Sequence, residues 1–266
     1  MEYVGYFLAI MVGTTLGLIG GGGAILTVPI LVYILAINPM LATTYSLFIV
    51  GLSSLVGLIK KSKEKNVDYK IAVIFGIPSI AVVYLVRHLL LPNIPDILFS
   101  EKSYHFTKSV ALMTIFSVVM ITASLSMIFA GSKIKKASNQ ETVNNYFTIF
   151  NQALLVGIIT GLVGAGGGFL IIPALVVLIK MPMKKAVGTS FMIIAMNSII
   201  GFAGSLNTSL IIDWQLLITF SIFSIIGIYI GTFLSKKISG EKLKSMFGWF
   251  VLLMGICIII KEILLQ

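Results

Sequence analysis

The chain has 266 residues, of which 58% are hydrophobic and 11% are charged, whereas soluble domains carry about a quarter charged residues. This composition excludes a water-soluble domain and indicates a polytopic membrane protein in a lipid bilayer. The formal net charge of +10 does not indicate a nucleic-acid partner, because the lysines gather in short loops between apolar runs, as in cytoplasmic loops of membrane proteins.

The first apolar run, residues 3–37, is interrupted by a glycine cluster, and the run at 146–180 repeats this pattern. Residues 17–29 read GLIGGGGAILTVP, and residues 161–173 read GLVGAGGGFLIIP. A repeat of this kind at one fixed offset indicates an internal duplication. The correspondence continues without a gap through the pairs Ala42/Ala186, Ser46/Ser190 and Gly57/Gly201.

The remaining apolar runs are long enough to cross a membrane as helices. They lie near 41–59, 71–91, 108–130, 186–206, 211–234 and 246–264. The chain therefore divides into an N-terminal membrane repeat (1–131), a cytoplasmic linker (132–145) and a C-terminal membrane repeat (146–266). Each repeat is expected to be one glycine-broken helical hairpin followed by three transmembrane helices. The longest irregular piece is expected at 92–107.

Loop charge predicts the orientation of the spans, because lysine-rich loops stay in the cytoplasm. Loops 60–70, 131–145, 180–185 and 235–245 are rich in lysine. Segment 146–180 would then start and end inside, and its equivalent 3–37 would start and end outside. These expectations describe an all-α polytopic membrane protein built as an inverted repeat of two halves, with both termini outside. The alternative, eight single crossings with parallel halves, would place loop 235–245 outside against its lysines.

The glycine clusters are the first candidates for substrate binding. Lipid cannot hydrogen-bond a broken backbone, so a helix is interrupted at membrane depth only beside protein or a polar cavity. Paired interruptions in two halves point to the central site of a transporter, where restarted helices present free N–H groups to an anion. The alternative is close helix packing of the small-xxx-small kind, which Gly13, Gly17 and Gly21 would allow. The candidate glycines are Gly20, Gly21, Gly22, Gly23, Gly164, Gly166, Gly167 and Gly168.

Polar side chains at the start of the next span in each half are the second group of candidates. They are Thr43, Thr44, Ser46, Thr189, Ser190 and Asn197. Such groups can coordinate an oxyanion or Na⁺, although they also bond back to their own helix or to a neighbour. Arg87, the single arginine of the chain, lies near an end of its span and is expected to snorkel to the interface. Ser190 and Thr189 are therefore expected to matter more for substrate binding than Arg87.

The apolar spans contain no Ser/His/Asp set, paired carboxylates or metal-ligand cluster. Neither an enzyme nor a metal or cofactor site is therefore expected.

The duplicated motif resembles that of the TauE/SafE (sulfite exporter-like) permeases. Residues 161–168, Pro173 and Gly188-Thr189-Ser190 carry the resemblance in the second half. The first half departs from it, because Tyr45 stands where the second half has Thr189, and Thr44 where it has Gly188. The resemblance implies a secondary transporter of sulfite, sulfonates or related organosulfur and carboxylate anions.

The expected function is a secondary transporter of the cytoplasmic membrane that moves a small anion by alternating access at a midplane site between the repeats. H⁺ or Na⁺ is the candidate coupling ion. One alternative is a channel-like anion pore with the glycine-tipped hairpins as its filter. Another is a membrane-embedded assembly component in which the glycines only pack helices.

Overall fold

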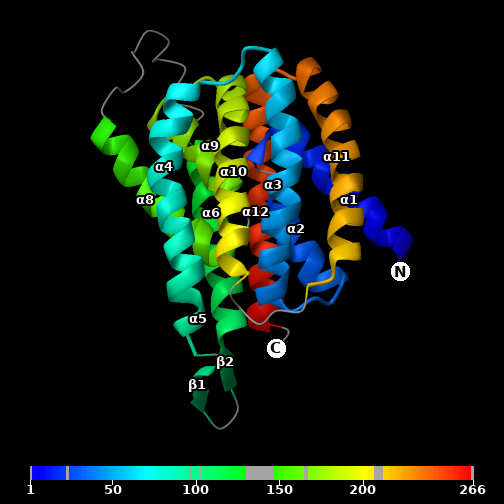
Figure 1. Ribbon diagram of the computed structural model, residues 1–266, viewed down its shortest axis with the longest axis vertical. Helices are drawn as coiled ribbons and strands as arrows, with labels where there is room; N and C mark the ends of the chain where they lie inside the picture. Colours follow the sequence, from blue (N-terminus) through cyan, green and yellow to red (C-terminus); the bar gives the residue numbers. More distant parts are fainter. Residues whose placement is uncertain are drawn as a thin grey trace.

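The computed structural model describes residues 2–21, 24–95, 97–101, 104–129, 146–164, 167–206 and 212–264, so the predicted linker lies outside the described residues. The described chain forms a bundle of long helices that run roughly side by side (Figure 1). Five of these are long and apolar enough to cross a membrane, which makes the protein an all-α polytopic membrane protein. They are α3 (Pro39–Lys63), α4 (Tyr69–Leu85, continued to Asn93 by η3, Val86–Leu90, and α5, Leu91–Asn93), α6 (Lys108–Phe129), α10 (Met183–Ser205) and α11 (Trp214–Lys237). A further helix, α12 (Gly240–Leu264), packs along α6.

The two glycine-broken segments fold alike, element by element. In the first half α1 (Glu2–Ile19) is followed by α2 (Ala24–Pro29) and the π-helix η2 (Ile30–Ile34); in the second half α8 (Tyr146–Val163) is followed by α9 (Gly168–Pro173) and the π-helix η4 (Ala174–Leu178). In both, proline is the last residue before the π-helix. Proline lacks a backbone donor and crowds the carbonyl of the preceding turn, which accounts for the local change in helix geometry.

Helix packing in one half has a counterpart in the other. α1 packs along α11, and α8, which corresponds to α1, packs along α4, which corresponds to α11. α3 packs against its own counterpart α10, and α6 packs against its own counterpart α12. Exchanging the two halves therefore converts the α1–α11 contact into the α8–α4 contact and leaves the α3–α10 and α6–α12 contacts unchanged.

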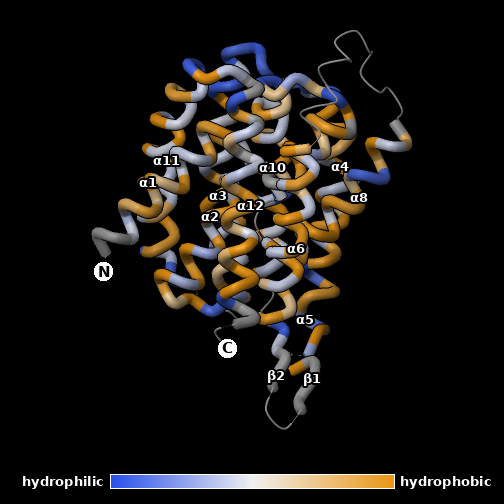
Figure 2. The backbone as a smooth tube through the Cα atoms, turned by 180° about the vertical axis from the view of Figure 1, so that it is seen from behind, coloured by the Kyte–Doolittle hydropathy of each residue, from blue (hydrophilic) through white to orange (hydrophobic). Residues whose placement is uncertain are grey.

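Three lysine-rich loops meet at one end of the bundle, here called the lysine-rich end. Lys185 Nζ lies 3.5 Å from a carboxylate oxygen of Asp68, and Lys236 Nζ lies 2.9 Å from a carboxylate oxygen of Glu64. Figure 2 shows hydrophilic residues gathered at this upper end and hydrophobic residues along the bundle below it. Three of the loops that the sequence assigns to the cytoplasm, 60–70, 180–185 and 235–245, thus share one face.

The two broken segments enter the bundle from opposite ends. Near the start of α1, a Cβ built on Gly5 would lie 3.8 Å from the side chain of Leu35, just beyond η2, so the first segment returns to the end at which it begins. α8 begins at the lysine-rich end (Figure 1), and η4 leads back to that end through Lys185.

The sequence suggested that segment 92–107 is irregular, but most of it has regular secondary structure. β1 (Ile97–Glu101) and β2 (Tyr104–Thr107) form an antiparallel hairpin at the end of the bundle opposite the lysines (Figure 1). Lys108, the first residue of α6, donates hydrogen bonds from its ammonium to the carbonyl oxygens of Leu91 and Ile94, which ties the base of the hairpin. Strands this short carry too little alternation to be told from a polar loop.

Candidate functional site

The backbone of both broken segments turns at equivalent glycines. Gly20 has φ +77° and Gly164 has φ +72°, a conformation that favours glycine because it has no Cβ. Gly167 also has a positive φ, +67°, and a Cβ at this position would overlap the hydroxyl of Thr160 on α8. The glycine clusters are therefore required by the turn itself, beyond any role in packing. Gly22, Gly23 and Gly166 lie outside the described residues.

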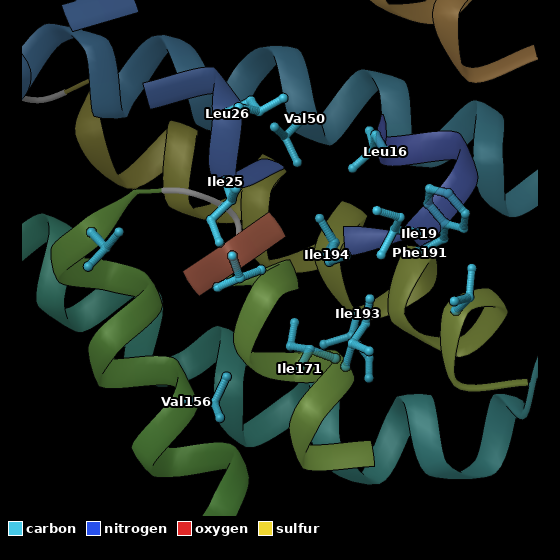
Figure 3. Close-up of a cluster of buried hydrophobic side chains, with 14 of the residues drawn as sticks. Leu16, Ile19, Ile25, Leu26, Val50, Val156, Ile171, Phe191, Ile193 and Ile194 are labelled. Carbon is cyan, nitrogen blue, oxygen red and sulfur yellow. The ribbon is translucent and has the colours of Figure 1, made fainter. Parts of the chain in front are cut away.

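Gly21 and Gly168 meet inside the bundle, and we call this contact the glycine crossing. A Cβ built on either residue would overlap backbone atoms of the other. A Cβ on Gly21 would also overlap the side chain of Ile194, and Figure 3 shows Ile194 within a cluster of buried apolar side chains. The two halves thus close on each other by backbone contact within an apolar wall.

Other glycines of the same segments pack helices, as the alternative interpretation expected. A Cβ on Gly13 would overlap the backbone of Ser224 on α11, and a Cβ on Gly157 of α8 would lie 2.9 Å from the carbonyl oxygen of Ser79 on α4. Gly13 and Gly157 correspond in the repeat, and Ser79 and Ser224 stand at the same distance from Asp68 and Asp213, the residues that cap α4 and α11. The glycines before each break therefore serve close helix packing, and those at the break form the turn and the crossing.

Arg87 does not snorkel to the interface, so the sequence expectation for this residue is wrong. Its side chain is only 2% exposed, and its Nη1 donates a hydrogen bond of 3.2 Å to Thr43 Oγ1 on α3. The reason is the second hairpin: its turn at Gly164 lies over the guanidinium, so that a Cβ there would overlap Nη2 of Arg87. The position of this lone arginine along its span does not reveal that a segment from the other half covers it.

The equivalent turn of the first half has apolar surroundings. A Cβ on Gly20 would lie 2.9 Å from Val187 Cγ1 and 3.2 Å from Ser190 Oγ, both at the start of α10. Val187 corresponds to Thr43 in the repeat, and Ser190 Oγ donates to the carbonyl oxygen of Val187 at 2.9 Å. The turn at Gly164 thus contacts a cation directly, whereas the nearest contacts of the turn at Gly20 are aliphatic side chains and one hydroxyl.

Tyr45 and Thr189, whose mismatch set the halves apart in the sequence, make equivalent contacts. Thr189 Oγ1 accepts a hydrogen bond of 2.9 Å from the backbone N–H of Asp68, and Tyr45 Oη accepts one of 2.7 Å from the backbone N–H of Asp213. Each aspartate caps the next helix, α4 or α11. The two side chains therefore fasten helix entries at opposite ends of the bundle.

Asn197 bridges two helices near the middle of α10. Its Nδ2 donates to Ser79 Oγ at 2.7 Å, while its Oδ1 has no hydrogen-bond partner. The corresponding residue of the first half, Ser53, donates to Ser224 at 3.0 Å. Asn197 thus has a packing role and also retains one free acceptor.

The remaining predicted hydroxyls differ in how far they are satisfied. Thr43 and Thr44 donate back to the carbonyl oxygen of Met40 at 2.8 and 3.2 Å, whereas buried Ser46 Oγ has no partner. Among the described residues, five further hydroxyls that the sequence did not single out are also buried without a partner: Thr27 on α2, Thr160 on α8, and Ser54, Ser198 and Ser221. Because buried polar groups are nearly always hydrogen-bonded, these hydroxyls are available to a ligand or to water.

A cavity of about 190 Å³ opens at the lysine-rich end, and we call it the lysine vestibule. Lys61, Lys184 and Lys236 line it with Glu64 as their counter-charge, and Val187 connects it to the turn at Gly20. Burial alone would raise the pKa of Glu64, but hydrogen bonds from Lys236 and Lys61 outweigh it and lower the pKa below its ordinary value. The carboxylate stays ionised, and the excess of positive charge favours anions in this cavity.

Comparison with known proteins adds to this geometry. The profile of the family described as Sulfite exporter TauE/SafE matches residues 6–258. A probable membrane transporter protein of Xylella fastidiosa is 30% identical to this chain, over 94% of the chain and 91% of the relative. A probable membrane transporter protein of Methanocaldococcus jannaschii is 27% identical, over 94% of this chain and 93% of the relative. YunE of Bacillus subtilis, also named a probable membrane transporter protein, is 29% identical, over 73% of this chain and 74% of the relative. No solved structure matches the chain.

Proposed function

The chain belongs to the sulfite exporter TauE/SafE family of membrane transporters, and we propose that it moves a small anion across the cytoplasmic membrane by alternating access. The substrate would be sulfite, a sulfonate or a related organosulfur or carboxylate anion. The site would lie between the two halves, with H⁺ or Na⁺ as coupling ion. A transporter of this kind rocks one repeat against the other around a site formed by broken helices.

The observation that carries the proposal is the glycine crossing. Two helices interrupted at equivalent glycines arrive from opposite ends and touch at Gly21 and Gly168. A backbone interrupted at membrane depth must find its hydrogen bonds in protein or in a polar cavity, and the unpartnered buried hydroxyls of Thr27 and Thr160 lie on the interrupted segments. If one hairpin moves away from the other, the site between them can be reached from one side of the membrane while the opposite side stays closed.

The inverted repeat is part of the proposal. Two observations support it: helix contacts in one half have counterparts in the other, and α1 and α8 enter the bundle from opposite ends. The hydrogen bonds of Tyr45 and Thr189 at opposite ends follow the same relation. With lysine-rich loops held in the cytoplasm, the first hairpin would open outside and the second inside.

The channel-like pore is the weaker alternative. A fixed filter needs an open path lined by polar groups, whereas Gly21 and Gly168 are in backbone contact beside Ile194. This close contact between the two halves favours a mechanism in which a conformational change opens the path.

Flux through purified protein in liposomes tests the function. We expect uptake of at least one anion among sulfite, thiosulfate, methanesulfonate and acetate to saturate with concentration and to depend on an imposed H⁺ or Na⁺ gradient. Conductance that rises without saturation would support the channel instead. No flux of any of these anions would support a role in membrane assembly.

Site-specific labelling tests the topology. In a Cys257→Ser background, which removes the single cysteine, cysteine replaces one of three exposed residues: Lys65, Lys184 or Asn93. We expect a membrane-impermeant maleimide added to intact cells to label position 93 and to spare 65 and 184 until the cells are opened. Labelling of position 184 from outside would contradict the inverted repeat, because segment 146–180 would then cross the membrane an odd number of times.

A further inference from the structure

Arg87 is a buried cation with unused hydrogen-bonding capacity. Its side chain is 2% exposed, Nη1 bonds to Thr43 Oγ1, and Nε and Nη2 have no partner. Within the described residues, the acidic side chains in ion pairs are Glu64 and Asp68, and neither pairs with Arg87. In the part of the chain that the structure describes, the guanidinium therefore has no counter-charge, although Arg87 belongs to a membrane-spanning segment.

The surroundings of Arg87 are small and come from both halves. A Cβ on Gly164 would overlap Nη2, and a Cβ on Gly204 of α10 would lie 3.4 Å from Cβ of Arg87. Thr43 completes this cradle from α3. Gly164 and Thr43 therefore contact the guanidinium itself, and Gly204 lies beside the base of the side chain.

Lys108 shows how this protein accommodates a buried cation that has a structural role. Its ammonium is also buried, but it donates to the carbonyl oxygens of Leu91 and Ile94, where a helix ends. Those carbonyls carry the negative end of the helix dipole. Nε and Nη2 of Arg87, by contrast, donate to no acceptor in the described structure. A structural role of the kind that Lys108 has therefore does not account for the buried charge of Arg87.

From this we infer that Arg87, with Thr43 and the turn at Gly164, forms an oxyanion subsite in which the planar guanidinium binds two oxygens of one anion. Burial of an unpaired charge is strongly unfavourable, and a bound anion would remove that penalty. The parallel N–H groups of arginine fit carboxylates and tetrahedral or pyramidal oxyanions, whereas a halide offers only one point of contact. The inference rests on the proposed function and names the substrate class of that site.

The subsite is one-sided. Counted from the equivalent capping residues Asp68 and Asp213, the position that corresponds to Arg87 in the second half is Thr232, and the residue equivalent to Thr43 is Val187. One anion subsite would therefore serve both access states, and the second hairpin, whose turn contacts the guanidinium, would respond directly to its occupancy.

Binding of radiolabelled sulfite to purified protein, together with the Tm of the unliganded protein, tests the inference. We expect Arg87→Gln to weaken sulfite binding about tenfold or more, as loss of a charged hydrogen-bond donor does, and Arg87→Lys to weaken it less. The Tm of unliganded Arg87→Gln should equal or exceed that of the wild type, because an uncompensated buried charge is removed. Chloride at the same ionic strength should not compete with sulfite.

Two matched variants control for structure. Lys108→Gln removes a buried cation that has carbonyl partners, and it should lower the Tm and keep the sulfite affinity. Thr232→Val, at the position equivalent to Arg87 in the second half, should also keep the affinity, because its hydroxyl donates to the carbonyl oxygen of Ile228 in its own helix. Unchanged binding by Arg87→Gln, or weakened binding with a lowered Tm, would overturn the subsite and leave the transport proposal standing. Absence of wild-type binding and flux for sulfite, thiosulfate, methanesulfonate and acetate would overturn the proposed function itself.

Discussion

Replacing Gly168 by valine is expected to abolish transport while the protein remains folded in the membrane. The new Cβ would overlap Cα of Gly21, so the two hairpins could no longer meet at the glycine crossing. The long interfaces between α1 and α11 and between α3 and α10 do not involve this contact, so most of the fold would persist. Initial rates of anion uptake in proteoliposomes would fall to the background of empty liposomes, with a monodisperse profile in size-exclusion chromatography.

Gly76→Ala is the control for this variant. Gly76 lies in α4, and its added methyl would approach only the Met196 side chain, at an ordinary 3.6 Å. Uptake by this control should match the wild type. Gly167→Val should behave like Gly168→Val, because its φ is positive and its Cβ would overlap Thr160. Wild-type uptake by Gly168→Val would mean that the crossing plays no part in transport.

The duplicated motif allowed much of the fold to be predicted. Glycine clusters and prolines at one offset predicted two broken segments of the same construction, and the structure has both, down to the π-helices after Pro29 and Pro173. Lysines 184 and 185 predicted that loop 180–185 shares a face with loop 60–70, and the ion pair between Lys185 and Asp68 joins them. These features were accessible because they follow from local backbone chemistry and loop charge.

The chemistry of the candidate site was less accessible because it depends on contacts between halves. Arg87 looked like an interfacial residue by its place in the span, and only the turn at Gly164 buries it. Thr189 looked like a ligand by its hydroxyl, yet that hydroxyl accepts the N–H of Asp68. A sequence predicts the position of a residue within its own membrane span. It does not predict which other segment of the chain will cover that side chain.

A glycine that packs helices should respond differently from a glycine at the crossing, and Gly231→Val tests this difference. Gly231 lies on α11, where an added Cβ would overlap the carbonyl oxygen of Thr14 and lie 2.8 Å from the backbone nitrogen of Leu18. On the facing helix, a Cβ on Gly17 would lie 2.5 Å from the carbonyl oxygen of Ile228. Small residues permit this backbone approach, which drives helix association in lipid, where the hydrophobic effect is absent.

Valine at 231 would therefore separate α1 from α11 along their shared face. Overpacking of this kind costs about 3 kcal/mol, equivalent to a Tm lower by about 10 °C. A thermal ramp followed by fluorescence-detected size exclusion would measure the loss. The adjacent residue provides the control, since Ile230 is 43% exposed and Ile230→Val should leave the Tm unchanged. If Gly231→Val instead kept its Tm and lost only transport, this interface would slide during the transport cycle, and the separation between packing glycines and crossing glycines would be wrong.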